Sequence, residues 1–210
     1  MTDSHAPSVG PLCKRFRGFL PVIVDVETGG FNPNTDALLE IAVVVIEQND
    51  QGRFVPGATH HEHVEPFAGA NLDPKALAFT GIIPDHPLRF AKAEKDALQA
   101  IFGPIKQAIQ QTNCQRAVLV GHNAQFDLSF LQAAIERTQV KSPFHRFTTL
   151  DTATLSALAV GHTVLAKSCQ LAGIPFDGKQ AHSALYDALR TADLFCHIVN
   201  RWDTNDNNLA

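Results

Sequence analysis

Two acidic residues close the first strongly apolar stretch of the chain. Asp25 and Glu27 follow three β-branched residues in VIVDVETGGF and stand two positions apart. Residues two apart in a strand point to the same face, so their carboxylates should project together. Neighbouring carboxylates raise each other's pKa, and a divalent cation removes that penalty. Because carboxylate oxygens suit Mg²⁺ or Mn²⁺, the pair predicts a metal site; the alternative is a turn-forming Asp25 beside an exposed Glu27.

Two later segments carry acidic residues that could reach the same edge of a sheet. Asp127 lies in the first turn of a predicted helix in VGHNAQFDLSFL, directly after a strand. In AHSALYDALRTADLF, His182 precedes a helix and Asp187 follows in it. Ligands of α/β sheets usually bind where strands end and helices begin. Taken singly, each acid has an ordinary alternative, namely a helix-dipole partner for Asp127 and a solvated helix face for Asp187.

The combined order D-x-E, H-N-x-x-F-D and H-x-x-x-x-D resembles the DEDDh group of 3′-to-5′ exonucleases. The resemblance covers about residues 19–197 and is close in RFRGFLP, DVETGGFN, HVEPF, ALAFTGI and LFCHIVNRW. It implies a ribonuclease H-like fold and hydrolysis of single-stranded 3′ ends of tRNA and other stable RNAs, releasing 5′-nucleoside monophosphates, with single-stranded DNA as a further substrate. It also implies His182 as general base. Two Mg²⁺ ions, replaceable by Mn²⁺, would be held by Asp25, Glu27, Asp127 and Asp187.

Aromatic residues near the acids are the candidate contacts to terminal bases. Stacking on an aromatic ring grips unpaired bases without regard to sequence. The resemblance implies this role for Phe31, Phe79, Phe126 and Phe147, and implies backbone contacts to the terminal sugar at Thr80, Gly81 and Ile82. Most of the fourteen phenylalanines must be core, which favours Phe31 and Phe79 over the other two. Lys75 stands where the family usually has an acid, so the preferred terminal base stays open.

Basic residues cluster near the N-terminus in CKRFRGF. Such residues can follow phosphates, although on the sequence alone an ordinary solvated segment is favoured. The resemblance implies a homodimer in which a basic patch of one subunit delivers RNA to the active site of the other. The residues that match this patch are Arg15, Arg17 and Arg116, and less closely Lys141.

The segment HHEHVEPF also suggests metal binding. His61 and His63 share one face of a predicted strand, with Glu62 opposite. Two histidines without a third ligand make a weak zinc signal, and a polar edge strand is the favoured interpretation.

Composition limits the class of protein. The chain has 210 residues, of which 45% are hydrophobic and 18% charged, as in a single globular domain. A net charge of −4 excludes a uniformly basic protein but permits a local basic patch. Four scattered cysteines without a CxxC pair indicate reduced thiols in an intracellular compartment. With no secretory or membrane-spanning pattern, we expect a cytoplasmic protein without membrane contact.

The expected elements form an α/β domain. Three strands with short turns, followed by alternating strands and helices, predict a mixed five-stranded sheet flanked by helices. This domain should span 13–202, between flexible ends at 1–12 and 203–210. Strands are expected at 19–26, 37–47, 60–67, 117–123 and 147–151. Helices are expected at 74–80 with Asp73 as cap, 91–111, 124–137 with Asn123 as cap, 152–159, 164–172 and 184–200.

Two further functions remain open on the sequence. One is a proofreading exonuclease acting on DNA, and the other is a catalytically silent RNA-binding module on the same fold. The arginine-rich start and the phenylalanines favour an exoribonuclease over the first. The four mutually repelling acids and His182 argue against the second, since a silent module has no need of them.

Overall fold

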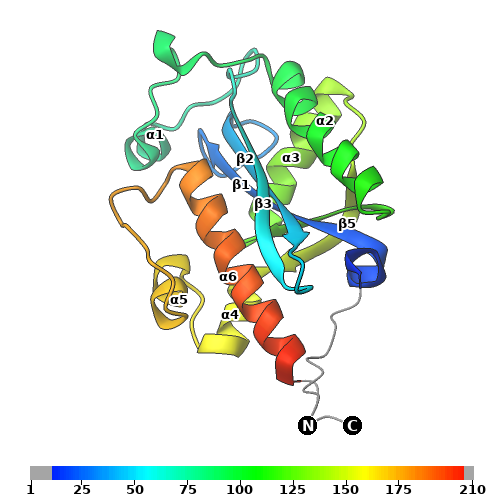
Figure 1. Cartoon of the computed structure of the whole chain (residues 1–210). Coiled ribbons are helices and arrows are strands. Elements are labelled where there is room, and N and C mark those ends of the chain that lie inside the picture. The colour runs from blue at the N-terminus through cyan, green and yellow to red at the C-terminus, as the bar shows by residue number, and fades with distance from the viewer. Residues whose placement is uncertain (1–10, 206–210) are drawn as a thin grey trace, which may run out of the picture.

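Five strands form one mixed sheet (Figure 1). The computed structural model describes residues 11–205. The sheet order is β3-β2-β1-β4-β5; β1 runs antiparallel to β2 and parallel to β4, β2 and β3 are antiparallel, and β4 and β5 are parallel. The predicted five-stranded mixed sheet is therefore confirmed. The strands are β1 (Phe19–Thr28), β2 (Leu38–Gln48), β3 (Phe54–His63), β4 (Arg116–Gly121) and β5 (Phe144–Asp151).

Helices cover the sheet on both sides, with α6 packed across β1, β2 and β3, and α2 and α3 against the opposite side (Figure 1). Because both faces are covered, the central strands are apolar almost throughout, as in VIV of β1 and IAVVVI of β2. The helices are α1 (Pro74–Thr80), α2 (Glu94–Gln111), α3 (Gln125–Thr138), α4 (Thr152–Val160), α5 (Leu165–Leu171) and α6 (Ala184–Asn205). Short 3₁₀ turns are η1 (Leu12–Lys14), η2 (Phe16–Gly18) and η3 (Pro87–Arg89).

The third strand departs most from its predicted bounds. It starts at Phe54 and ends at His63, whereas the sequence predicts 60–67. A turn held by the Asn49 side chain, which accepts hydrogen bonds from the Gln51 and Arg53 N–H groups, pairs β3 with β2 along its whole length. Pro56 argues against a strand when the sequence is considered alone. However, β3 lies at the edge of the sheet, where proline is tolerated.

The starts of the elements agree only in part with prediction. The Asp73 carboxylate accepts a hydrogen bond from the Lys75 N–H at 2.8 Å, so the predicted cap of α1 is confirmed. The predicted cap of α3 is wrong, because Asn123 has a left-handed φ of 70° and α3 begins at Gln125 without a side-chain cap. Two other starts shift by three residues, to Glu94 for α2 and Phe144 for β5.

The predicted domain ends lie mostly outside the described residues, at 1–10 and 206–210. Leu12, expected in a flexible segment, is only 5% exposed and packs on the core. The last helix reaches Asn205, three residues beyond the predicted domain end. Among the residues described, no helix combines the length and the apolar character that crossing a bilayer requires.

Candidate active site

Three of the predicted acids meet beside the carboxyl end of β1. Asp25 and Glu27 lie on one face of that strand, and Asp187 comes from the first turn of α6. One carboxylate oxygen from each of the three lies within 4.8 Å of the other two. The packing of α6 on the central strands therefore brings residues more than 150 positions apart in the chain to one cluster, as the spacing predicted.

The fourth acid joins from the opposite helix layer. Asp127 stands in the first turn of α3, and its Oδ1 accepts a hydrogen bond from the Val26 N–H at 3.0 Å. This contact places Asp127 next to Val26, the residue between Asp25 and Glu27. Gly121 makes room for it, because a Cβ there would stand 3.1 Å from Asp127 Oδ2. The strand β1 is thus held between two helices that each supply an acid.

The pKa of each of the four carboxyl groups is raised above its ordinary value. Burial is the main cause in each case, and it raises the pKa of Glu27 and of Asp127 to about 8. The pKa of Asp25 is raised well above its ordinary value by burial and then by the charges of Asp127, Glu27 and Asp187. Burial also raises the pKa of Asp187, against the opposing effect of a hydrogen bond from His182. Such a site binds protons or cations far better than an exposed group does.

The donor set fits divalent metal ions. Oδ1 of Asp187 is buried and has no hydrogen-bond partner, and the Asp187 carboxylate belongs to the acid cluster. An unpartnered buried oxygen is costly unless something positive meets it. The carboxylates supply only hard oxygen donors, which is the chemistry that Mg²⁺ and Mn²⁺ select. The residues present therefore fit the metal ions that the sequence predicted.

His182 is held next to this cluster by its backbone. Its N–H donates to Asp187 Oδ2 at 2.9 Å, and its φ of 68° is left-handed, so the turn before α6 is tightly bent. The exposed imidazole packs on Phe79, with ring centroids 4.1 Å apart. Thr80 and Gly81 line the same cavity as His182, which has a volume of about 350 Å³. The backbone hydrogen bond fixes the position of the His182 backbone, while its imidazole ring stays exposed to solvent.

The predicted aromatic residues divide into three places. Phe31, 82% exposed, meets the half-buried Phe126 edge to face at 6.3 Å, beside Asp127. Phe79, 66% exposed, accompanies His182. Phe147, which the sequence ranks below Phe31 and Phe79 as a base contact, is 77% exposed and contacts His145 and Arg146. Exposed aromatic rings thus lie beside His182 and beside Phe126, and a third exposed ring lies in β5.

The loop that carries Phe31 is built around one buried carboxylate. Asp36 accepts hydrogen bonds from the Asn32 N–H, the Thr35 hydroxyl and the Asn71 side chain. A Cβ at Gly30 would collide with Asp36 Oδ2, so a side chain there would displace the carboxylate. The absence of a side chain at Gly30 therefore leaves room for the Asp36 carboxylate.

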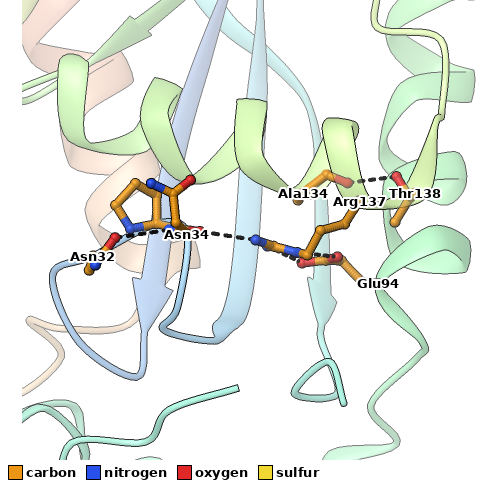
Figure 2. A network of polar contacts seen from close by, with 7 residues as sticks. Asn32, Asn34, Glu94, Ala134, Arg137 and Thr138 are labelled. Carbon is orange, nitrogen blue, oxygen red and sulfur yellow. Dashed lines mark hydrogen bonds and ion pairs between the residues drawn. The ribbon is translucent and has the colours of Figure 1, made fainter. Parts of the chain in front are cut away.

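An arginine ties the same loop to the helices. Figure 2 shows Arg137 of α3 pointing between Glu94 and the loop after β1. It donates from Nε and Nη2 to the two oxygens of Glu94 at 3.1 and 2.6 Å, and from Nη1 to the Pro33 carbonyl at 3.0 Å. Glu94 is only 8% exposed, so the pair is well shielded from water. The network fixes the base of the loop on which Phe31 stands.

Replacing Arg137 with alanine should destabilise the protein by about 3–5 kcal/mol, because Glu94 would keep a buried charge without its partner. Thermal and urea unfolding measure this loss. The double variant Arg137→Leu with Glu94→Leu, which removes both charges, should recover most of the stability. A single variant as stable as the wild type would show that the pair carries little energy.

The predicted basic residues lie at the other end of β1. Arg17 stacks over Phe19 at 5.1 Å, and Phe19 pairs in register with Arg116 of β4. Arg146, which no sequence pattern singled out, lines a cavity with Arg116. Arg15 lies instead over Phe16 and Phe54. Phe19 precedes Asp25 by six residues, which is about 20 Å along a strand, so this basic surface is remote from the acids of the same chain.

Three residues around the acids escaped prediction from the sequence. Asp151, at the end of β5, accepts hydrogen bonds from the Ala124 and Ala153 N–H groups at 3.0 and 2.8 Å, and so holds two helix starts. His122 bonds Thr152 and the Thr163 carbonyl, and burial lowers the pKa of its imidazole. Glu40 pairs in register with Glu27. His122 stands in the H-N-x-x-F-D motif, which is the one signal that could have singled it out.

Comparison with known proteins agrees with this arrangement. The exonuclease family model RNase_T matches residues 22–195 of the chain. Ribonuclease T of Hahella chejuensis is 61% identical over 203 residues, 96% of this chain and 93% of that protein. This chain belongs to the ribonuclease T family of exonucleases. It is therefore a 3′-to-5′ exonuclease, as the order of its acids predicted.

Other relatives support the family and the fold. Ribonuclease T of Shewanella denitrificans is 61% identical over 189 residues, covering 90% of this chain and 84% of that protein. A full-length 3′-exonuclease superposes with a TM-score of 0.69 at 17% identity, over 87% of this chain and 61% of that one. Exonuclease I of E. coli with a dT13 oligonucleotide gives 0.64 at 16% identity, over 91% of this chain and 43% of that one. This chain thus has the ribonuclease H-like fold that these exonucleases share.

Proposed function

We propose that this exonuclease trims single-stranded 3′ ends of tRNA and other stable RNAs, releases 5′-nucleoside monophosphates, and also acts on single-stranded DNA. The observation that carries the proposal is the acid cluster with two exposed rings near it, Phe79 packed on His182 and Phe31 packed on Phe126. A site of this kind suits an unpaired terminus, because bases must leave a duplex before they can stack on protein rings. The relatives at about 60% identity are called ribonuclease T, which favours RNA.

The four acids would hold two Mg²⁺ ions, with Mn²⁺ as a substitute. When bound, such ions lower the pKa of a water molecule and neutralise charge on the phosphate and the leaving oxygen. The chain's own contribution is to collect the ligands: β1 orients Asp25 and Glu27, α3 supplies Asp127 through its bond to Val26, and α6 supplies Asp187. A bound cation would offset the burial and the repulsion that together raise the pKa of Asp25.

His182 would accept the proton of the attacking water. Histidine exchanges protons near neutral pH, which makes it an efficient general base. Its backbone bond to Asp187 sets it beside the ligands, and its exposed ring can swing toward the phosphate. Phe79 would stack on a terminal base next to it, and the backbone of Thr80 and Gly81 would face the terminal sugar, since both line the His182 cavity.

A homodimer would explain why the basic surface is remote from the acids of its own chain. We propose that Arg15, Arg17 and Arg116 of one subunit bind the RNA backbone and lead it to the acids of the other. Exposed Phe147, next to Arg146, would stack on bases along this path. Sedimentation velocity gives the oligomeric state directly. We place the enzyme in the cytoplasm, because its four cysteines are free thiols.

A 3′-tailed RNA hairpin and its DNA counterpart test this function. The wild type with Mg²⁺ should shorten the RNA tail one nucleotide at a time and stop near the duplex, whereas EDTA or Asp25→Asn should abolish cleavage. Asp50→Asn, in an exposed turn, serves as the matched control and should cleave normally. Faster removal of the DNA tail would favour a proofreading role, and tight binding without cleavage would favour a binding module.

A further inference from the structure

Three potential metal ligands converge beside the acid cluster without sharing a residue with it. In the β2–β3 ladder Glu40 lies opposite His63, and His61 lies opposite Ala42. Residues opposite each other in a ladder share one face of the sheet, so both imidazoles flank the Glu40 carboxylate. His61 Nε2 lies 3.6 Å from Glu40 Oε2, and His63 Nδ1 lies 3.0 Å from Oε1. The pairing of β2 with β3 therefore brings Glu40 to the two histidines as a third ligand, which the sequence alone did not reveal.

Both imidazole nitrogens are directed at the Glu40 carboxylate. His61 Nε2 and His63 Nδ1 are buried, and neither has a hydrogen-bond partner, because their contacts with Glu40 miss hydrogen-bond geometry despite the short distances. The two rings pack edge to face at 4.7 Å, so neither can turn away without losing that contact. Buried polar atoms without partners are costly, and two aimed at one carboxylate indicate a site suited to a cation.

We propose that Glu40, His61 and His63 bind Zn²⁺ or a similar transition-metal ion, with solvent as the fourth ligand. Ligand atoms about 2.0–2.1 Å from a tetrahedral Zn²⁺ stand roughly 3.3 Å apart, and the measured nitrogen-to-oxygen separations of 3.0 and 3.6 Å bracket that value. Two imidazoles and one carboxylate are also a ligand set that zinc enzymes use. The ion would join β2 to the edge strand β3.

This site would select a different ion from the acid cluster. Imidazole favours zinc, cobalt and nickel, whereas the all-carboxylate cluster suits Mg²⁺. An ion can reach Glu40 through the cavity that also contains Arg89. The Arg89 charge opposes a cation, although its Nη1 and Nη2 donate to the Pro84 and Leu39 carbonyls. The competing explanation is an ion pair among the three side chains that binds no metal.

Co²⁺ is the probe that separates these explanations, because its visible absorption reports tetrahedral nitrogen and oxygen ligands. The double variant Asp25→Asn with Asp187→Asn lacks most of the background metal binding at the acid cluster. It should still bind one Co²⁺ per chain, and Zn²⁺ should displace it. Adding His61→Ala or His63→Ala should weaken binding at least tenfold, whereas His60→Ala, on the other face of β3, should leave it unchanged.

X-ray absorption of the zinc-loaded wild type provides a readout that needs no variant. Scattering from two imidazoles in the zinc shell is expected. A shell of oxygen alone, Co²⁺ binding lost with the acids, or binding indifferent to both histidine substitutions would overturn the proposal and leave the ion pair as the explanation.

Discussion

Replacing His182 with alanine should lower turnover on single-stranded RNA by about 10²–10⁴-fold, the usual range for a lost general base. Substrate binding should persist, because the variant keeps the backbone N–H that bonds Asp187 and leaves the four acids in place. His182→Asn is a useful second variant, since asparagine also tolerates the left-handed φ at this position. Both should show the same loss if the imidazole itself moves the proton.

Single-turnover rates at saturating Mg²⁺ measure this effect, with binding followed separately on an RNA that resists cleavage. His60→Ala, on β3, controls for the removal of a histidine as such. Normal turnover by either variant would remove His182 from the role of base.

The same histidine shows what the sequence could convey. The motifs give the order of the acids and His182 along the chain. The predicted strands and helices correctly place these residues at one edge of the sheet. The sequence could not show that the His182 ring packs on Phe79, because that contact joins α1 to the turn before α6. Spacing within an element is local information, whereas contacts between elements depend on the whole fold.

Glu40 and Asp151 also owe their positions to contacts between elements, which the sequence does not show. Glu40 sits in ALLEIAVVV as one polar residue in a buried strand, and only the register with β1 and β3 sets it between Glu27 and His63. Asp151 accepts hydrogen bonds from four backbone N–H groups, and the one from Ala124 crosses 27 positions of the chain. Asn123 is the local candidate for the cap of α3, which is why the sequence predicts it. The helix has no side-chain cap, and the distant Asp151 carboxylate instead holds the Asn123 and Ala124 N–H groups just before it.

Without metal, the protein should lose stability as the pH rises from about 5 to about 8.5. The pKa of Glu27 and of Asp127 is about 8 in the folded protein, against ordinary values of 4.5 and 3.8. Groups with a raised pKa bind protons more strongly when folded. Their contribution is therefore complete below the unfolded values and is lost as the pH passes through about 8. The loss should be on the order of 3 kcal/mol, since a tenfold change in proton affinity corresponds to about 1.4 kcal/mol and solvent relaxation reduces the sum.

Mg²⁺ should reverse this loss at pH 8.5, because the cation replaces the protons that the acids have released. Melting curves with EDTA and with Mg²⁺ should differ by about 5–10 °C at that pH and much less at pH 5, where protons compete for the same oxygens. Asp25→Asn should melt higher than the wild type in EDTA at pH 8.5, since one repelling charge is gone, and should gain less from Mg²⁺. Asp50→Asn should follow the wild type. A flat stability profile in EDTA, or a Mg²⁺ effect that Asp25→Asn leaves unchanged, would show that the four acids are not coupled through a shared cation site.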